Sequence, residues 1–418
     1  MIEKRLIDIS RNISSGITPL RSNDEFWTDG TIPWLKTEQL GEKYIFDTNE
    51  YITEKALQEA NVKLFPENIL SIAMYGEGKT RGNVSILKRP MATNQACCNI
   101  ELDAEKVSSE YVYYFLKTQY ENLRGLSSGI RKNLNTNDIK NFVIRLPENL
   151  KTQQSIAAVL SALDKKIALN KQINARLEEM AKTLYDYWFV QFDFPDANGK
   201  PYKSSGGDMV FDETLKREIP KGWEVKSLGE VISLERGVTY SKDSICNDEN
   251  GTGVLRATNI SGNNIDLNDL IYISGEVGTQ QKLKPFDILI VMSSGSKEHI
   301  GKNGVYYFEQ DNAFGAFCSK ITPKKVFFEF VSIFLQSNNF RNYVKNQCLG
   351  TNINNLNNSH ILHCPIVRPN DEYIEVFHKQ IKLIYEKISC NVKQNHQLTQ
   401  LRDFLLPMLM NGQVSVAE

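Results

Sequence analysis

Residues 163–188, LDKKIALNKQINARLEEMAKTLYDYW, decide the fold of this chain. Apolar side chains recur in this stretch at alternating steps of four and three, and two asparagines occupy positions in the same series. The series is Leu163, Ile167, Asn170, Asn174, Leu177, Ala181, Leu184 and Trp188. Such spacing places all of these side chains along one seam of an α-helix, as in a coiled coil. We therefore predict a long helix over residues 151–190.

The same series returns 221 residues later, as Ile384, Ile388, Asn391, Asn395, Leu398, Arg402, Leu405 and Leu409. One such stripe would fit a helix packed on its own domain equally well, but two copies with polar layers at identical places favour mutual pairing. A seam asparagine is satisfied only opposite a polar partner, so it fixes register at a cost in stability. We predict that Asn170, Asn174, Asn391 and Asn395 set the register of the helix pair. An antiparallel pairing would give a pseudo-two-fold dumbbell.

The repeat continues upstream of both helices, through most of the chain. Asn135, Ile139 and Pro147 match Asn357, Ile361 and Pro369; Glu110 and Val112 match Glu329 and Val331; Ile69 and Leu70 match Ile288 and Leu289 at an offset of 219; and Gly16 matches Gly237. Each copy begins with short β-rich runs (69–73 and 83–87; 288–292 and 304–308) and short helices (108–123; 327–345). The predicted fold class is α+β, with two mixed α/β domains joined by a pair of long antiparallel coiled-coil helices.

Five segments follow from this pattern. They are a first globular domain (1–150), its helix (151–190), a connector (191–222), a second globular domain (223–371), and the second helix with a tail (372–418). The connector is rich in turn residues and reads as an exposed loop with a few hydrophobic anchors.

Composition limits the class of protein. The 418 residues are 41% hydrophobic, which is enough for more than one buried core, and no apolar run approaches the roughly 20 residues of a membrane span. Residues 1–9 lack the apolar core of a secretory signal, so we expect a cytoplasmic protein. Seven cysteines, two of them adjacent, argue for reduced thiols. The net charge of −1 means that any nucleic-acid footprint must be local or shared with a partner.

Three features together resemble the specificity subunits of type I restriction-modification systems over essentially the whole chain. They are the duplicated unit with a coiled-coil helix after each globular part, the connector from Phe194-Pro195 to Ile219-Pro220-Lys221-Gly222-Trp223-Glu224, and the loop from Ser128-Gly129 to Asn133-Leu134-Asn135. The Ile-Pro-x-Gly-Trp phrase is the most specific of them, and the first copy begins without it.

The resemblance implies that each globular domain is a target-recognition domain that reads one half of a bipartite site in double-stranded DNA. It also implies that the helices set the spacer and dock two modification (methyltransferase) subunits, which restriction (helicase-nuclease) subunits join. The chain itself would have no catalytic residue, cofactor or metal. S-adenosylmethionine, ATP and Mg would bind the partner subunits.

Loop residues that suit DNA contacts are found in both copies. Long cations on loops can reach phosphates, and Arg, Asn and Ser can read base edges, although any one of them can equally belong to a solvated face. The candidates are Lys36, Lys79, Arg81, Asn83, Arg131, Lys132, Asn133, Arg256, Ser294, Lys297, Lys302, Asn352 and Asn354.

Other patterns do not support an enzyme. Residues 73–80 resemble a P-loop, but Ala73 stands where the phosphate-binding turn needs glycine. His360, His363 and Cys364 have no counterparts in the first copy, so we do not expect a metal site there. The chain has no Asn-Pro-Pro-aromatic tetrapeptide of the kind found in amino-methyltransferases.

The alternative function is a coiled-coil scaffold that links two protein-binding domains without DNA.

Overall fold

The computed structural model describes residues 1–76, 78–126, 133–247, 251–348 and 355–416. The chain forms two compact units, the first made of Met1–Ile167 with Leu398–Glu418 and the second of Ala168–Gln397. The boundary between the units therefore falls inside the two long helices, α5 (Leu150–Tyr185) and α9 (Asp371–Met410), so that each unit contains part of both.

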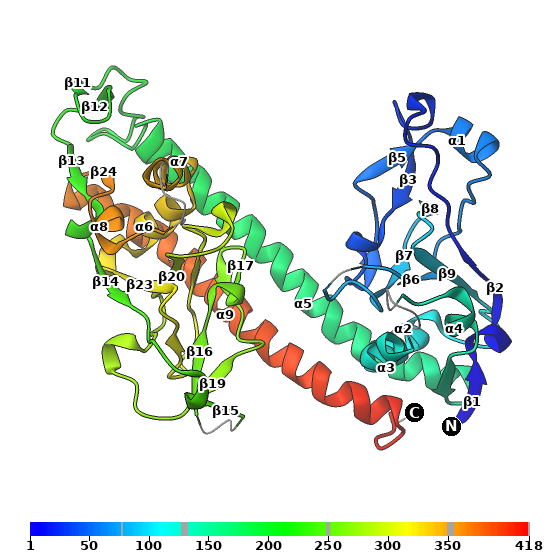
Figure 1. Cartoon of the computed structure of the whole chain (residues 1–418). Helices are drawn as coiled ribbons and strands as arrows, with labels where there is room; N and C mark the ends of the chain where they lie inside the picture. Colours follow the sequence, from blue (N-terminus) through cyan, green and yellow to red (C-terminus); the bar gives the residue numbers. More distant parts are fainter. Residues whose placement is uncertain (77, 127–132, 248–250, 349–354, 417–418) are drawn as a thin grey trace. The chain divides into compact units, whose positions relative to one another are not determined.

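The first unit combines ten strands and four short helices with its share of the long helices, within the described residues (Figure 1). They are β1 (Ile2–Arg5), β2 (Ser10–Ser15), β3 (Ile32–Leu35), β4 (Tyr44–Ile45), β5 (Glu50–Ile52), α1 (Glu54–Glu59), β6 (Leu70–Ala73), β7 (Val84–Leu87), β8 (Ala92–Thr93), β9 (Cys97–Leu102), α2 (Ser109–Thr118), α3 (Tyr120–Gly125), α4 (Thr136–Lys140) and β10 (Val143–Leu146).

The second unit contains the connector hairpin and a copy of the same set of elements. They are β11 (Met209–Asp212), β12 (Arg217–Pro220), β13 (Glu224–Ser227), β14 (Ile232–Arg236), β15 (Ile245–Cys246), β16 (Thr252–Leu255), β17 (Ile260–Ser261), β18 (Asn264–Ile265), β19 (Ile271–Ile273), β20 (Ile288–Val291), β21 (Asn303–Val305), β22 (Ala313–Phe314), β23 (Cys318–Pro323), α6 (Phe328–Gln336), α7 (Asn338–Gln347), α8 (Asn358–Leu362) and β24 (Pro365–Arg368).

The two units share one sheet topology, which confirms the repeat predicted from the sequence. The larger sheet has the order β2-β9-β6-β7-β4 in the first unit and β14-β23-β20-β21-β18, extended by β17, in the second. The smaller sheet has the order β5-β3-β8 in the first and β19-β16-β22, extended by β15, in the second. The pair β1–β10 likewise recurs as β13–β24.

The predicted match of Leu70 with Leu289 is wrong by one residue. Leu70 pairs with Ile86 and Ile100, and the residue with the equivalent partners, Val305 and Ile321, is Ile288. All four residues of β6 and of β20 are buried, so neither strand has a face in contact with solvent. A strand that is hydrophobic on both faces carries no alternation, and its register cannot be taken from the sequence.

The predicted helices at 108–123 and 327–345 are each two helices. Gln119 separates α2 from α3 with φ −98° and ψ 12°. Ser337 is extended between α6 and α7, and its hydroxyl caps α7 by accepting a hydrogen bond from the Phe340 N–H at 3.2 Å. Helix periodicity continues across both breaks, which is why the sequence did not reveal them.

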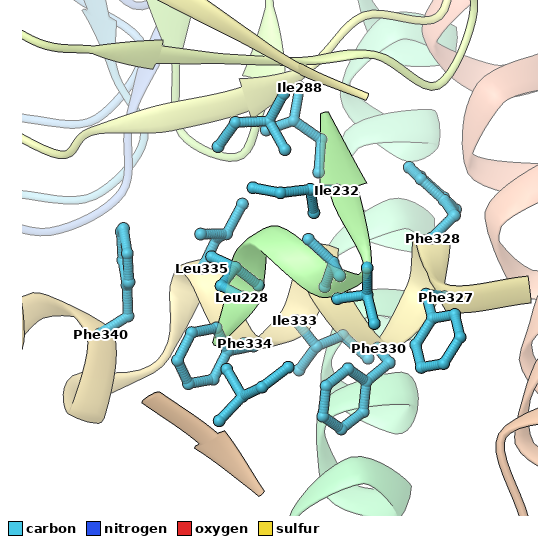
Figure 2. Packing of buried hydrophobic residues seen from close by; sticks show 14 of the residues in the cluster. Leu228, Ile232, Ile288, Phe327, Phe328, Phe330, Ile333, Phe334, Leu335 and Phe340 are labelled. Carbon is cyan, nitrogen blue, oxygen red and sulfur yellow. The ribbon is translucent and has the colours of Figure 1, made fainter. Parts of the chain in front are cut away.

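Helix α6 is buried and largely apolar on all sides because it lies inside the core of the second unit. Phe330, Ile333 and Leu335 are buried in one cluster with Leu228 and Ile288, as Figure 2 shows. A helix that is hydrophobic all round is one that other elements cover all round. Burial of a single Leu, Ile or Phe side chain contributes about 1.5–3 kcal/mol, so this cluster accounts for much of the stability of the second unit.

The long helices run antiparallel within each unit, and none of the predicted seam residues is exposed. In the second unit, Asn170 donates through Nδ2 to Asn395 Oδ1 at 2.9 Å, and Asn391 Nδ2 donates to Asn174 Oδ1 at 2.8 Å. In the first unit, Arg402 Nη1 lies 3.0 Å from Asp164 Oδ1. The polar layers predicted from the sequence therefore meet one another across the seam.

Both long helices also complete the globular cores. Leu409 and Met410 of α9 are buried in the core of the first unit. Tyr185 of α5 and Trp188, in the π-helical turn Asp186–Val190 that follows it, are buried in the core of the second unit. In the described part of the chain, no helix combines the length and apolar character that a membrane crossing requires.

Gly16 and Gly237 match as predicted, and each allows the same close approach. A Cβ on Gly16 would lie 2.0 Å from the Thr93 carbonyl oxygen, and one on Gly237 would lie 2.3 Å from the Gly315 carbonyl oxygen. Both obstacles are backbone atoms, which cannot turn aside as a side chain can. Glycine is therefore required where the chain leaves β2 and β14 to pass beside the smaller sheet.

The paired asparagines predict a double-mutant cycle. Asn174→Leu should lower the free energy of unfolding by about 1–3 kcal/mol, because it leaves the buried Asn391 amide without its acceptor. Asn391→Leu should do the same, whereas the double variant should approach the stability of the parent, since no polar group is then left unpaired. The measurement is chemical denaturation of the full chain followed by circular dichroism. Gln172→Leu, at an exposed position of α5, is the control. A double variant whose loss of stability equals or exceeds the sum of the two single losses would contradict this pairing.

Gly237→Ala should destabilise the second unit by about 1–3 kcal/mol, the usual cost of overpacking. Thermal unfolding of the full chain measures this as a lower melting temperature. Gly295→Ala is the matched control, because an added Cβ at Gly295 meets nothing within 4 Å. Equal melting temperatures for the two variants would show that the backbone at Gly237 yields without cost.

Candidate nucleic-acid interface

In the first unit, three loops meet beside the end of β6. The Met74 N–H donates to the Ala96 carbonyl at 2.8 Å, and the Leu134 N–H donates to the Met74 carbonyl at 3.1 Å. We call residues 74–76, 78–83, 94–96 and 133–134 the first loop edge. Lys79 and Gln95 are exposed on it, and Asn133 is half-buried.

Side chains of helix α3 donate hydrogen bonds to backbone carbonyls of this loop edge. The Tyr120 hydroxyl donates to the Lys79 carbonyl at 2.6 Å, and Arg124 Nη1 donates to the Gly78 carbonyl at 2.8 Å. Arg124 therefore supports the loop that carries Lys79. The Lys79 side chain is exposed to solvent, while these hydrogen bonds fix the backbone that carries it.

The second unit builds the same edge with different residues. The Met292 N–H donates to the Phe317 carbonyl at 2.8 Å, and the Leu356 N–H donates to the Met292 carbonyl at 2.8 Å. We call residues 292–302, 315–317 and 355–356 the second loop edge. The predicted Lys297 and Lys302 are exposed on it. Ser294 Oγ accepts from the Ser296 N–H at 3.3 Å.

Two of the predicted cations occupy equivalent places, and both form ion pairs within the protein. Lys36 follows β3, and its Nζ lies 2.8 Å from Oε1 of Glu38 and 2.5 Å from Oε1 of Glu50. Hydrogen bonds to both carboxylates raise the pKa of the Lys36 ammonium. Arg256 follows β16 and lies 3.3 Å from Asp269. A DNA contact by either residue would have to compete with these carboxylates.

The remaining predicted residues fall into two groups. Asn83 donates through Nδ2 to the Leu40 carbonyl at 3.1 Å, and Arg81 is half-buried in the first loop edge. Arg131, Lys132, Asn352 and Asn354 lie outside the described residues. The structure thus brings Lys79, Arg81, Asn83 and Asn133 into one edge and Ser294, Lys297 and Lys302 into the other, while Lys36 and Arg256 belong to the smaller sheets.

Sequence reasoning missed several residues of these surfaces. Gln95 accepts a hydrogen bond from the Thr18 hydroxyl, and the Ser293 hydroxyl donates to Asn355 Oδ1 at 2.5 Å. Phe317 is 70% exposed. Thr18 and Gln95 are 77 positions apart in the sequence, so no local pattern could have joined them. Phe317 lies in an apolar run that resembles core.

The enzyme motifs set aside from the sequence take other structural roles. The P-loop-like residues lie between β6 and β7, whereas a phosphate-binding loop leads into a helix. Asn357 caps α8, because its side-chain oxygen accepts a hydrogen bond from the His360 N–H at 2.9 Å. The described residues contain no cluster of three or more His, Cys, Asp or Glu side chains that could hold a metal ion.

Comparisons with known proteins agree with this architecture. The family model of the type I restriction modification DNA specificity domain matches residues 3–179 and again residues 220–400. The chain is 30% identical over 424 residues to the type I restriction enzyme MjaIX specificity subunit of Methanocaldococcus jannaschii, covering 99% of this chain and 94% of that protein. It is 36% identical over 143 residues to the EcoKI specificity subunit of Escherichia coli, covering 33% and 31% of the two chains.

A solved structure shares the fold across the whole length. The S subunit of a type-I restriction-modification system from M. genitalium superposes with a TM-score of 0.54 at 16% identity, covering 98% of this chain and 95% of that one. The family model matches the chain twice, once on each copy of the repeat. This chain therefore belongs to the family of type I restriction-modification DNA specificity subunits.

Proposed function

We propose that this chain selects the DNA sequence for a type I restriction-modification complex, with each unit reading one half of a bipartite site. The observation that carries the proposal is the duplicated loop edge. Both units use one sheet topology to bring three loops together, and both place exposed lysines there. Lysines of this kind suit phosphate contacts, while neighbouring Asn, Gln and Ser side chains suit base edges.

The charge of the whole chain is compatible with this role because the cations are local. The net charge is −1, yet Lys79 of the first edge and Lys297 and Lys302 of the second are exposed. Phosphate contacts depend on the field at the contact surface, since charges farther away than about 8–10 Å are largely screened at physiological salt. Partner subunits would supply the further cations that stable binding requires.

We assign methyl transfer and cleavage to partner chains, because this sequence has neither a complete P-loop nor a methyltransferase tetrapeptide. In this proposal the long helices dock two modification subunits and set the spacer, and restriction subunits join the complex. S-adenosylmethionine, ATP and Mg bind those partners.

Exchange of one globular domain should change one half of the methylated motif. The first exchange replaces residues 1–149 with those of a relative and keeps α5 and α9. The second replaces residues 223–370. Each should alter a different half-site, because each unit has its own core and its own loop edge. Long-read sequencing of methylated bases in a host with the partner subunits is the measurement.

The control for these exchanges is the same host without this gene, in which the motif should be unmethylated. An exchange that altered both half-sites at once would contradict the assignment of one half-site to each unit. Methylation of the same motif without this gene would remove the proposed function altogether.

Lengthening both helices should widen the gap between the half-sites. Four residues inserted after Ile167 and four after Gln397 lie at the boundary between the units and spare the helix residues that complete each core. The insertion adds roughly 6 Å and a rotation of about 40° beyond a full turn. One base pair turns about 34–36°, so the gap should grow by one base pair and at most two, with unchanged half-sites.

The methylated motif again reports the outcome. Four residues inserted after Glu213, in the exposed turn of the β11–β12 hairpin, should leave the gap unchanged and serve as the control. Full methylation at the original gap by the helix variant would show that these helices do not set the spacer.

A further inference from the structure

Phe317 is exposed in the middle of a buried segment. It lies in the turn between β22 and β23, next to the larger sheet that contains β20 and β23 (Figure 1). Residues 312–315 and 318–320 around it are buried, while Phe317 itself is 70% exposed. Phe314 and Cys318, on the two sides of the turn, belong to one core cluster. The ring of Phe317 is therefore exposed to solvent, although the next residue in the chain, Cys318, belongs to the core.

The backbone of this turn is fixed, so the ring cannot swing inward. The Cys318 N–H closes the turn by donating to the Gly315 carbonyl at 2.9 Å. The Phe317 carbonyl accepts hydrogen bonds from the N–H groups of Met292 at 2.8 Å and Ser293 at 3.2 Å. Gly237 packs against the same turn at a distance that excludes any side chain. The exposure of Phe317 is thus built into the fold.

The surroundings of Phe317 are polar and cationic. Ser293, whose N–H contacts the Phe317 carbonyl, donates its hydroxyl to Asn355. Lys297 and Lys302 are exposed on the same loop edge, where they outnumber the exposed carboxylate of Glu298. An apolar ring on a surface of hydrogen-bonding groups and cations matches duplex DNA, which offers phosphates to the cations and thymine methyl groups to apolar side chains. The charge complementarity favours DNA over an apolar protein partner.

The first unit has no exposed ring at the equivalent place. The residue equivalent to Phe317 is Ala96, because both carbonyls accept from the residue at the end of the equivalent strand, Met292 or Met74. Ala96 is buried, and the exposed residue of that turn is Gln95. The equivalent turns of the two loop edges therefore expose different chemistry, an amide at Gln95 in the first unit and a phenyl ring at Phe317 in the second.

We propose that Phe317 is a specificity-determining residue that contacts the C5 methyl group of a thymine in the half-site read by the second unit. This inference rests on the proposed function and names the chemistry of one of its contacts. The C5 methyl group is the apolar group that thymine presents in the major groove, and it distinguishes thymine from cytosine and uracil.

The test measures binding of the complete complex to duplexes in which each thymine of the second half-site is replaced in turn by deoxyuridine, which lacks only the methyl group. At one position the parent complex should bind about three- to five-fold more weakly, as expected for loss of one buried methyl group. Phe317→Ala should bind the unsubstituted duplex roughly ten-fold more weakly and should be insensitive to deoxyuridine at that position.

Two variants control the measurement. Phe211→Ala removes another exposed phenyl ring of the second unit, 55% exposed on the connector hairpin, and should behave as the parent does. Phe317→Leu keeps an apolar side chain and should retain part of the sensitivity to deoxyuridine. Because Phe317 is outside the core, all three variants should show the melting temperature of the parent.

Three results would overturn the inference: a second half-site without any A·T pair, a parent complex that is insensitive to deoxyuridine throughout, or a Phe317→Ala complex that keeps the parental sensitivity. Each of these results leaves the proposed function intact so long as the domain exchanges still change the motif. Failure of those exchanges, in contrast, would remove the proposed function itself.

Discussion

The hydrogen bond from Asn391 to Asn174 lies in a helix seam that alternates apolar and polar layers, and the rest of the structure depends on the register that this seam adopts. The same two helices carry the residues that close both cores, Leu409 and Met410 in the first unit and Tyr185 and Trp188 in the second. A slip of either helix would leave buried amides unpaired and would withdraw these side chains from the cores. The cost of an unpaired buried amide, about 1–3 kcal/mol, therefore adds to the loss of packing.

The helices are joined to the globular parts by polar contacts that have diverged between the copies. Glu110 of α2 is half-buried, which disfavours its ionised form, but hydrogen bonds from Ser161 of α5 and from Tyr44 hold its pKa below the usual range. At the equivalent place in α6, burial raises the pKa of Glu329, although His378 of α9 lies 2.7 Å away and opposes the shift. The same fold therefore accommodates different polar partners of the glutamate in the two units, since apolar packing rather than these polar contacts determines the topology.

The exposed side chains of the loop edges have diverged further because the cores do not depend on them. Both rest on the same backbone hydrogen bonds at the end of β6 and of β20, which fix where the loops lie. The side chains that the loops expose are free to differ, as Lys79 does from Lys297 and Lys302. Sequence specificity can therefore change by substitution in the loops while the sheets and helices remain as they are.

The sequence by itself determined the duplication, the α+β class, the long helices and their polar layers, because helical periodicity and a repeat of 221 residues are local or directly countable signals. It also determined the match of Gly16 with Gly237. Only the tertiary structure decided the register of β6 and β20, since strands buried on both faces carry no alternation. Only the tertiary structure showed that Lys36 forms an ion pair with Glu50 and that Arg256 forms one with Asp269. It alone exposed Phe317, because the backbone of this turn is fixed by hydrogen bonds to Met292 and Ser293, which are distant from it in sequence.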